Sequence, residues 1–401
     1  MKLNQNFFRL EDDYLFSKIT EKTEDFSKKN PGVDFISLGI GDTTLPLCET
    51  VIRAMQKAVD EMSRKKTYRG YGPEHGYFFL REAIANYYKK RQVSLSPFEI
   101  FVSDGAGRDI ADITELFDRK SKVLTIDPAY PAYKDACIID NNEIIFLKTS
   151  EKNNFIPVPD YDIDCDIIYL CSPNNPTGAV YDKKTLEKWV DYALKKNAVI
   201  IFDSAYEAFI SDEDLPRSIF EIENAKKCAI EIASLSKTAG FTGIRCGYTV
   251  ISDELVFQDH KINELWRKRQ SIKSNGLNYI TQRGAEAVFS REGQKQIKSA
   301  ICYYKKNIKV ISSSLYSLGI WVFASSNSPY VWAKCPHNMN SWEFFDIILQ
   351  KAHVIVTPGE GFGKSGKSFV RLSGFTGKKE TLEAVNKIKN LKLTKDFSRF
   401  A

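Results

Sequence analysis

Short apolar runs alternate with amphipathic stretches through the middle of the chain, from about residue 77 onward. The apolar runs lie at 99–103, 122–127, 166–171, 198–203 and 229–233, and helical spacing marks stretches such as 77–92 and 183–196. Strands that are apolar on both faces are typical of a parallel sheet covered by helices on each side. The pattern therefore predicts an α/β fold with a large, doubly wound, mostly parallel sheet, whose ligands bind at the carboxyl ends of the strands.

The pattern changes after a polar and aromatic stretch at 254–310. Strand-like pieces follow at 320–324, 330–333, 354–357 and 368–373, with one helix near 340–351. We expect a smaller α+β domain there, formed by both chain ends. The length of 401 residues suits two domains, so we assign 46–290 to the large domain and 1–45 with 291–401 to the small one.

Composition excludes several classes of function. No run approaches the 18 or so apolar residues of a membrane span, and charges interrupt the first 30 residues, so we expect no signal peptide and a cytoplasmic protein. The net charge of +6 is spread over mixed helices, which gives little support to nucleic-acid binding. The eight cysteines show no C-x-x-C spacing, which predicts buried free thiols and no metal site.

A glycine-rich segment at Gly361–Ser368 formally matches both the Walker A motif and G-x-G-x-x-G. Each motif binds phosphate where it follows a strand and opens a helix, because the helix start supplies the N–H groups. Here Phe369–Ser373 has the composition of a strand. We therefore expect a loop over a pocket rather than a nucleotide site.

Chemistry-bearing residues gather where the run 229–233 ends. Ser234, Ser236 and Arg245 offer donors for a phosphate, and Lys237 is an amine suited to forming an imine if it is partly desolvated near cations. The plainer alternative is a polar loop with one exposed lysine.

Two other predicted strands end in polar residues. Asp203 ends the run 198–203, and a buried carboxylate needs a partner such as a protonated pyridine nitrogen, with Tyr206 bonding the ring's phenolic oxygen. Asp203 could equally be an ordinary turn residue. Asn175, in the proline-rich turn 172–178, can donate to the same oxygen, and Asn175–Pro176 is a candidate for a cis peptide bond.

Two further segments complete the candidate site. The glycines around Ala106 precede a helical stretch and offer N–H groups for a phosphate, and Tyr130 could stack on the pyridine face.

Together these residues resemble the fold-type I enzymes of the class I/II aminotransferase superfamily, which depend on pyridoxal 5'-phosphate (PLP). The resemblance rests on N-N-P-T-G at 174–178, Asp203 with Tyr206, S-x-S-K at 234–237 and Arg245.

Further segments are similar to one family within that superfamily, the LL-diaminopimelate aminotransferases. They are 14–16, 38–44, 69–76, 236–243, 275–276, 329–332, 357–363 and 369–371, and the similarity covers residues 7–377. The resemblance implies transfer of an amino group between LL-2,6-diaminopimelate and 2-oxoglutarate, with Lys237 as the catalytic residue. It also implies a homodimer with active sites at the subunit interface and small-molecule substrates.

The resemblance implies a role for each matching position. The phosphate contacts would be Ala106, Gly107, Ser234, Ser236, Arg245 and, from the partner subunit, Tyr71. The other cofactor contacts would be Tyr130, Asn175, Asp203, Tyr206 and Asn275. Arg371 would bind the substrate carboxylate bidentately. The remaining substrate contacts would be Tyr14, Gly41, Tyr130, Asn175, Asn275 and, from the partner, Glu74.

The chain departs from the family pattern near the expected phosphate site. The family usually has Gly-Ala-Lys where this chain has Gly105-Ala106-Gly107, and we expect Arg108 to replace the missing charge. Ser274 stands where the family tends to have Phe. Two other functions stay open: an aminotransferase that uses lysine or an aromatic amino acid, and a non-catalytic PLP-binding regulator. The regulator would need a DNA-binding module, for which the first 45 residues show no pattern.

Overall fold

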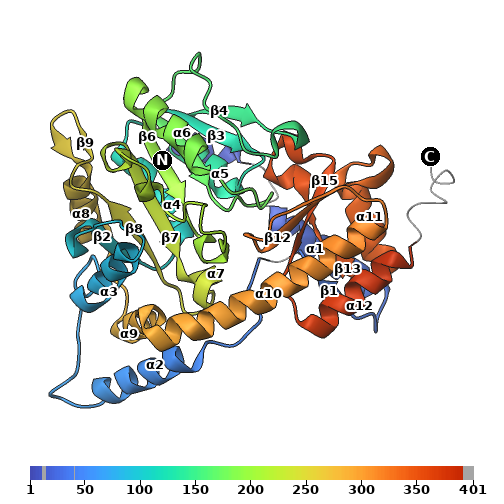
Figure 1. The fold of residues 1–401 in the computed structure, drawn as a ribbon, viewed down its shortest axis with the longest axis horizontal. Helices are drawn as coiled ribbons and strands as arrows, with labels where there is room; N and C mark the ends of the chain where they lie inside the picture. The colour runs from blue at the N-terminus through green and yellow to red at the C-terminus, as the bar shows by residue number, and fades with distance from the viewer. Residues whose placement is uncertain (11–14, 40, 392–401) are drawn as a thin grey trace.

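The computed structural model describes residues 1–10, 15–39 and 41–391, and its two domains lie side by side (Figure 1). The long helix α10 (Arg291–Ser317) runs along both of them. Ile297, Ile301 and Tyr304 of this helix pack in the core of the large domain. Ile308 and Ile311 pack in the core of the small one. The expected boundary at 290/291 therefore lies at the start of α10, whereas the two cores meet within the helix.

The large domain is built on a seven-stranded sheet of order β2-β8-β7-β6-β5-β3-β4. In this order the strands are Ile100–Ser103, Gly247–Ile251, Ala229–Ser234, Val199–Asp203, Ile167–Cys171, Lys122–Asp127 and Glu143–Lys148. The strands from β7 to β4 pair in parallel, and β8 is antiparallel to both of its neighbours. The predicted mostly parallel sheet is confirmed, and the sequence analysis missed β4 and β8.

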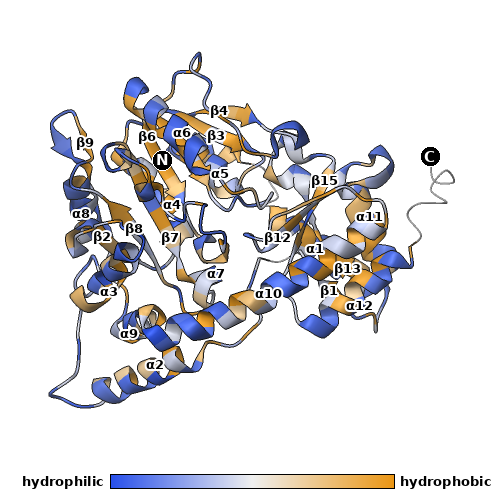
Figure 2. Cartoon of the chain, in the orientation of Figure 1, coloured by the Kyte–Doolittle hydropathy of each residue, from blue (hydrophilic) through white to orange (hydrophobic). Residues whose placement is uncertain are grey.

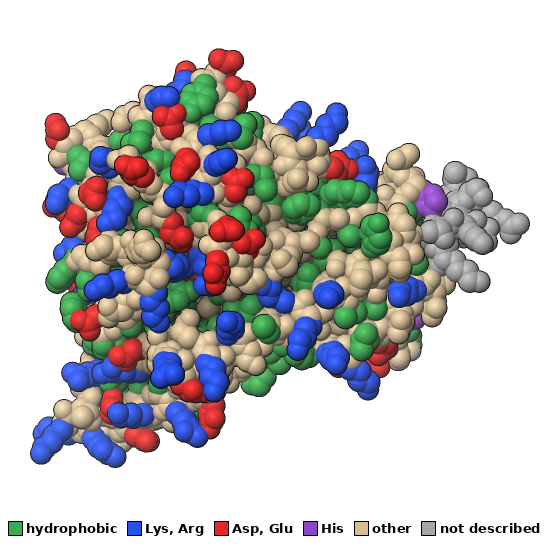
Figure 3. Space-filling view, viewed as in Figure 1, with side chains coloured by type: hydrophobic (Ala, Val, Ile, Leu, Met, Phe, Trp, Pro, Cys, Tyr) green, Lys and Arg blue, Asp and Glu red, His purple; other side chains and the backbone are tan. Residues whose placement is uncertain are grey.

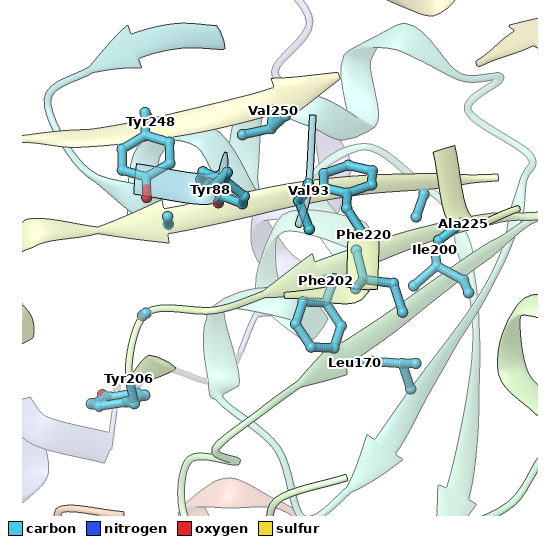
Figure 4. Packing of buried hydrophobic residues seen from close by; sticks show 14 of the residues in the cluster. Tyr88, Val93, Leu170, Ile200, Phe202, Tyr206, Phe220, Ala225, Tyr248 and Val250 are labelled. Carbon is cyan, nitrogen blue, oxygen red and sulfur yellow. The ribbon is translucent and has the colours of Figure 1, made fainter. Parts of the chain in front are cut away.

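Helices cover both faces of this sheet, which is why its central strands are apolar throughout. Alternate strand residues such as Leu170 and Phe202 point into one core, shown in Figure 4. Their neighbours Tyr169 and Ile201 point into the other. The first core is closed by α2 (Glu49–Met62), α3 (Phe78–Lys89), α6 (Lys183–Lys196) and α9 (Tyr279–Phe289). The second is closed by α4 (Ala106–Asp112), α5 (Pro131–Ile139) and α8 (Ile262–Lys273).

The small domain contains a four-stranded antiparallel sheet of order β11-β12-β15-β14. These strands are Val322–Ala324, Tyr330–Lys334, Phe369–Ser373 and Thr357–Pro358. The N-terminal strand β1 (Ile36–Ser37) pairs with β13 (Val354–Ile355), which brings both chain ends into one domain. The helices are α1 (Leu15–Lys29), α11 (Ser341–Ala352) and α12 (Lys378–Lys389).

The remaining elements are short. They are α7 (Leu235–Ala239), the hairpin of β9 (Val256–Phe257) and β10 (His260–Lys261), and 3-10 turns at Gln5–Arg9, Pro97–Glu99, Ile113–Leu116, Glu151–Asn153, Glu207–Phe209, Ile219–Glu221, Ala225–Lys227, Pro336–Asn338, Gly359–Phe362 and Lys364–Gly366. The glycine-rich segment thus leads into strand β15, as its composition predicts.

The distribution of apolar residues, charges and cysteines in the structure follows the expectations from composition. Figure 2 shows the strands mostly in the colour of apolar residues, and Figure 3 shows Lys and Arg interspersed with Asp and Glu over one face. All eight cysteines are free, and six are buried as predicted, whereas Cys48 is partly exposed and Cys302 is exposed. Within residues 1–10, 15–39 and 41–391, no helix combines the length and the apolar character that a membrane span requires.

Candidate active site

A cavity of about 350 Å³ lies at the carboxyl ends of the central strands of the large sheet. Most of the predicted site residues line it: Gly41, Ala106, Gly107, Tyr130, Asn175, Asp203, Tyr206, Ser234, Ser236, Lys237, Arg245 and Arg371. Parallel strands place their carboxyl ends at one edge, so residues that follow different strands meet there. Five lining residues had no site role in the sequence analysis: Phe16, Asp42 and Tyr330, which lie in the segments similar to the family, and Ile110 and Ala205.

Lys237 is the amine of this cavity, and it lies on the short helix α7 directly after β7. Burial is the main cause that lowers the pKa of its ammonium to about 8. The guanidinium groups of Arg371 and Arg245 also lower this pKa, and the carboxylate of Asp42 opposes them. A larger fraction of Lys237 is therefore neutral near pH 7 than of an exposed lysine, and the neutral amine is the nucleophile.

Donors for an anion lie beside Lys237. The Arg245 guanidinium donates to the Ser236 hydroxyl over 3.2 Å, and the Ser234 hydroxyl accepts from the Ser236 amide. Helix α4 begins at Ala106, so its first amides have no carbonyl partner one turn earlier. Gly105 has a φ of 137°, and a side chain there would overlap the Arg245 guanidinium. The close approach of two chain segments therefore requires this glycine and leaves a cradle for a small anion.

Asp203 is a buried carboxylate, only 4% exposed, at the end of β6. It accepts hydrogen bonds from the Tyr133 hydroxyl over 2.6 Å and from the Ala205 amide over 3.0 Å. Both donors are neutral, and burial raises the pKa of the carboxyl. Such a group is stabilised by a cation, which fits the predicted contact with a protonated ring nitrogen. The sequence analysis missed Tyr133, which packs parallel to Tyr169 with ring centres 4.7 Å apart.

Arg371, on β15, faces the same cavity from the small domain and is 1% exposed. It donates to the Asn175 side-chain oxygen over 2.5 Å and to the Gly39 carbonyl over 2.8 Å, and its guanidinium lies 4.4 Å from the centre of the Tyr330 ring. Its Nε has no acceptor among the described residues. A buried cation whose acceptors are neutral favours an anionic ligand.

The polar residues around Arg371 are already engaged with one another. The Tyr206 hydroxyl lies 2.6 Å from the Tyr330 hydroxyl, and Figure 4 shows Tyr206 at one side of the hydrophobic cluster, apart from Phe202 and Leu170. Asn175 presents its oxygen to Arg371, so its amide nitrogen is the donor that can face a ligand. The Asn175–Pro176 bond is cis, as predicted.

Among the described residues, four predicted ones are not part of the cavity lining: Tyr71, Glu74, Arg108 and Asn275. Tyr71 is 90% exposed, and the exposed Asn275 precedes Gly276, whose backbone packs against Pro73 and Glu74. Asn275 is therefore not among the residues that line the cavity of its own chain, and its role stays a prediction; it lies beside the segment of Glu74. Arg108 instead pairs with Asp112 along α4 over 2.5 Å, as its outward helix position dictates. Tyr14 lies outside the described residues.

Comparison with known proteins identifies the family of the chain. The family described as aminotransferase class I and II matches residues 33–388. The LL-diaminopimelate aminotransferases of Phocaeicola vulgatus and Bacteroides thetaiotaomicron are each 46% identical to the chain, over 96% and 97% of it and 98% and 99% of their own lengths. The solved L,L-diaminopimelate aminotransferase from Chlamydomonas reinhardtii is 36% identical with a TM-score of 0.92, over 98% of this chain and 99% of that one. The chain is therefore a member of the class I and II aminotransferase family.

Proposed function

We propose that this aminotransferase uses PLP to transfer an amino group from LL-2,6-diaminopimelate to 2-oxoglutarate, yielding tetrahydrodipicolinate and glutamate. The observation that carries the proposal is the cavity in which the Lys237 amine, the Asp203 carboxylate and the Arg371 guanidinium meet. The choice of donor rests on the relatives of 46% identity that bear this enzyme's name.

The residues of the cavity fit PLP by charge. The phosphate would lie against Arg245, Ser234, Ser236 and the first amides of α4, and the protonated ring nitrogen against Asp203. Bound PLP supplies an aldehyde that condenses with amines and a ring that withdraws electrons from the substrate Cα. Tyr133 holds the Asp203 carboxylate in place, and Tyr206 and the Asn175 amide are donors for the ring oxygen.

Two residues act on the substrate. Arg371 binds the α-carboxylate with a planar pair of N–H groups, because its other contacts fix the guanidinium plane. Lys237, as a neutral amine, would take the proton from the substrate Cα and, once protonated, would serve as the acid that returns a proton to the reacting atoms. Its lowered pKa suits both halves of this task near neutral pH. The same residues serve the reverse half-reaction with 2-oxoglutarate.

The proposal includes a homodimer that completes each site. Tyr71, at 90% exposed, is too apolar a residue to favour full contact with water, and Tyr68 and Ile272 are exposed as well. Glu74 and Asn275 lie on adjoining backbone segments, so both would enter the partner's cavity together. Glu74 would then bind the distal ammonium of diaminopimelate.

A half-reaction screen tests the proposal. The purified holoenzyme is mixed with LL-diaminopimelate, lysine, aromatic amino acids and glutamate, and the cofactor absorbance is followed. We expect LL-diaminopimelate and glutamate to react fastest, and Lys237→Ala to bind PLP without transferring an amino group. Rapid reaction of lysine or an aromatic amino acid without reaction of LL-diaminopimelate would refute the proposed donor, and near-normal turnover by Lys237→Ala would refute the role of Lys237.

A further inference from the structure

The glycine-rich segment 359–366 connects β14 to β15 in the small domain, and it binds the large domain at the end of β3. The Ala129 amide donates to the Phe362 carbonyl over 2.9 Å. The Ser365 amide donates to both carboxylate oxygens of Asp127 over 3.1 Å, and the Ser365 hydroxyl donates to one of them over 3.0 Å. Hydrogen bonds therefore join the two domains at two points beside the cavity.

Asp127 is enclosed by this segment. It is 3% exposed, and a side chain on Gly363, whose φ is 136°, would overlap its carboxylate. Lys148 and Lys364 are the cations near enough to act on it electrostatically. The glycine at 363 is therefore required by the approach of the segment to a carboxylate, which explains a glycine-rich pattern that does not open a helix.

The same segment contacts Arg371, the residue proposed to bind the substrate carboxylate. The Arg371 guanidinium lies 4.9 Å from the centre of the Phe362 ring, and Thr357, on β14 just before the segment, pairs with Arg371 across the sheet. On the other side, Ala129 precedes Tyr130, which lines the cavity. The segment thus links Arg371 in the small domain to the loop of Tyr130 in the large one.

We propose that Asp127 is a positioning residue: its hydrogen bonds to Ser365 hold segment 359–366 against the large domain and so fix Arg371 across the cavity from Tyr130. Asp127 does not line the active-site cavity, so it acts through the segment rather than on the substrate. The inference rests on the proposed role of Arg371 in binding a carboxylate. It predicts that loosening the segment weakens substrate binding while the cofactor contacts persist.

The test compares Asp127→Asn and Ser365→Ala with a matched control. Asp166 also accepts a hydrogen bond from a backbone amide, that of Lys122 over 2.7 Å, but it is exposed and lies at the amino ends of β3 and β5, away from the cavity. Asp166→Asn therefore removes a similar contact far from the cavity. Each holoenzyme is digested briefly with trypsin, and cleavage after Lys364 and Lys367 is quantified by mass spectrometry. We expect faster cleavage in both Asp127 and Ser365 variants and an unchanged rate in the control.

Kinetics supply the second readout. Loss of charge-assisted hydrogen bonds predicts a rise in KM for the amino donor of roughly tenfold or more in Asp127→Asn, with a smaller change in kcat. The double variant should show less than the sum of the two single effects, because both remove the same contact. If Asp127→Asn does not fold, the partly exposed Ser365→Ala carries the same test.

The outcomes separate this inference from the proposed function. A wild-type protein that transfers no amino group refutes the proposed function, and the trypsin comparison still decides whether Asp127 holds the segment. An active wild type whose Asp127 and Ser365 variants keep their KM overturns the inference. Equal cleavage of these variants and the Asp166→Asn control overturns it as well.

Discussion

The reaction of Lys237 with PLP should have an unusual pH dependence. Burial and nearby cations lower the pKa of this amine from 10.5 to about 8. At pH 7.5 an amine of pKa 8 is about one-quarter neutral and one of pKa 10.5 about 0.1% neutral, a difference of roughly 200-fold in the nucleophilic form. The pKa shifts downward because burial disfavours the charged ammonium form of the lysine.

The assay mixes cofactor-free protein with PLP between pH 6 and 10.5 and traps the adduct with borohydride. We expect the rate of adduct formation to rise about tenfold per pH unit at low pH and to level off just above pH 8. The trapped adduct should be found on Lys237. N-acetyl-lysine amide is the control, and its rate should keep rising to about pH 10. Asp42→Asn should move the plateau of the protein to lower pH, because the Asp42 carboxylate raises the pKa of Lys237. A protein rate that follows the control through pH 10 would refute the assignment of a desolvated amine.

Three other substitutions test separate parts of the site. Asp203→Asn should leave a folded protein with a large loss of kcat, because a neutral amide no longer stabilises the protonated ring; retained activity in a steady-state assay would make the carboxylate structural. Arg371→Lys should raise KM for the amino donor by roughly tenfold or more, since a single ammonium cannot replace two parallel N–H groups, and an unchanged KM would place the carboxylate elsewhere. Glu74→Gln should lower kcat/KM for LL-diaminopimelate by about tenfold or more while that for glutamate changes little; an equal loss for both would deny Glu74 a role in recognising the distal amine.

The sequence alone determined the large sheet and the chemical groups at its edge. Apolar runs that end at Asp203, just before Ser234 and four residues before Asn175 allow few arrangements of the strands, because parallel strands covered on both faces must gather their carboxyl ends. Lys237 could be assigned on the same basis, since only two residues separate it from the strand end at Ser234. These features depend on local periodicity and on a rule of sheet topology, both of which a single sequence contains.

Only the tertiary structure decided which partners complete the site. Tyr133 reaches Asp203 across 70 positions, Tyr330 reaches Tyr206 across 124, and Ser365 reaches Asp127 across 238. Neither hydropathy nor local spacing specifies such pairs, because a tyrosine or serine with the same neighbours could serve as core or surface. The structure likewise turned Arg108 toward Asp112 and set Asn275 beside Glu74, since helix phase and chain packing, rather than proximity in sequence, decide where a side chain points.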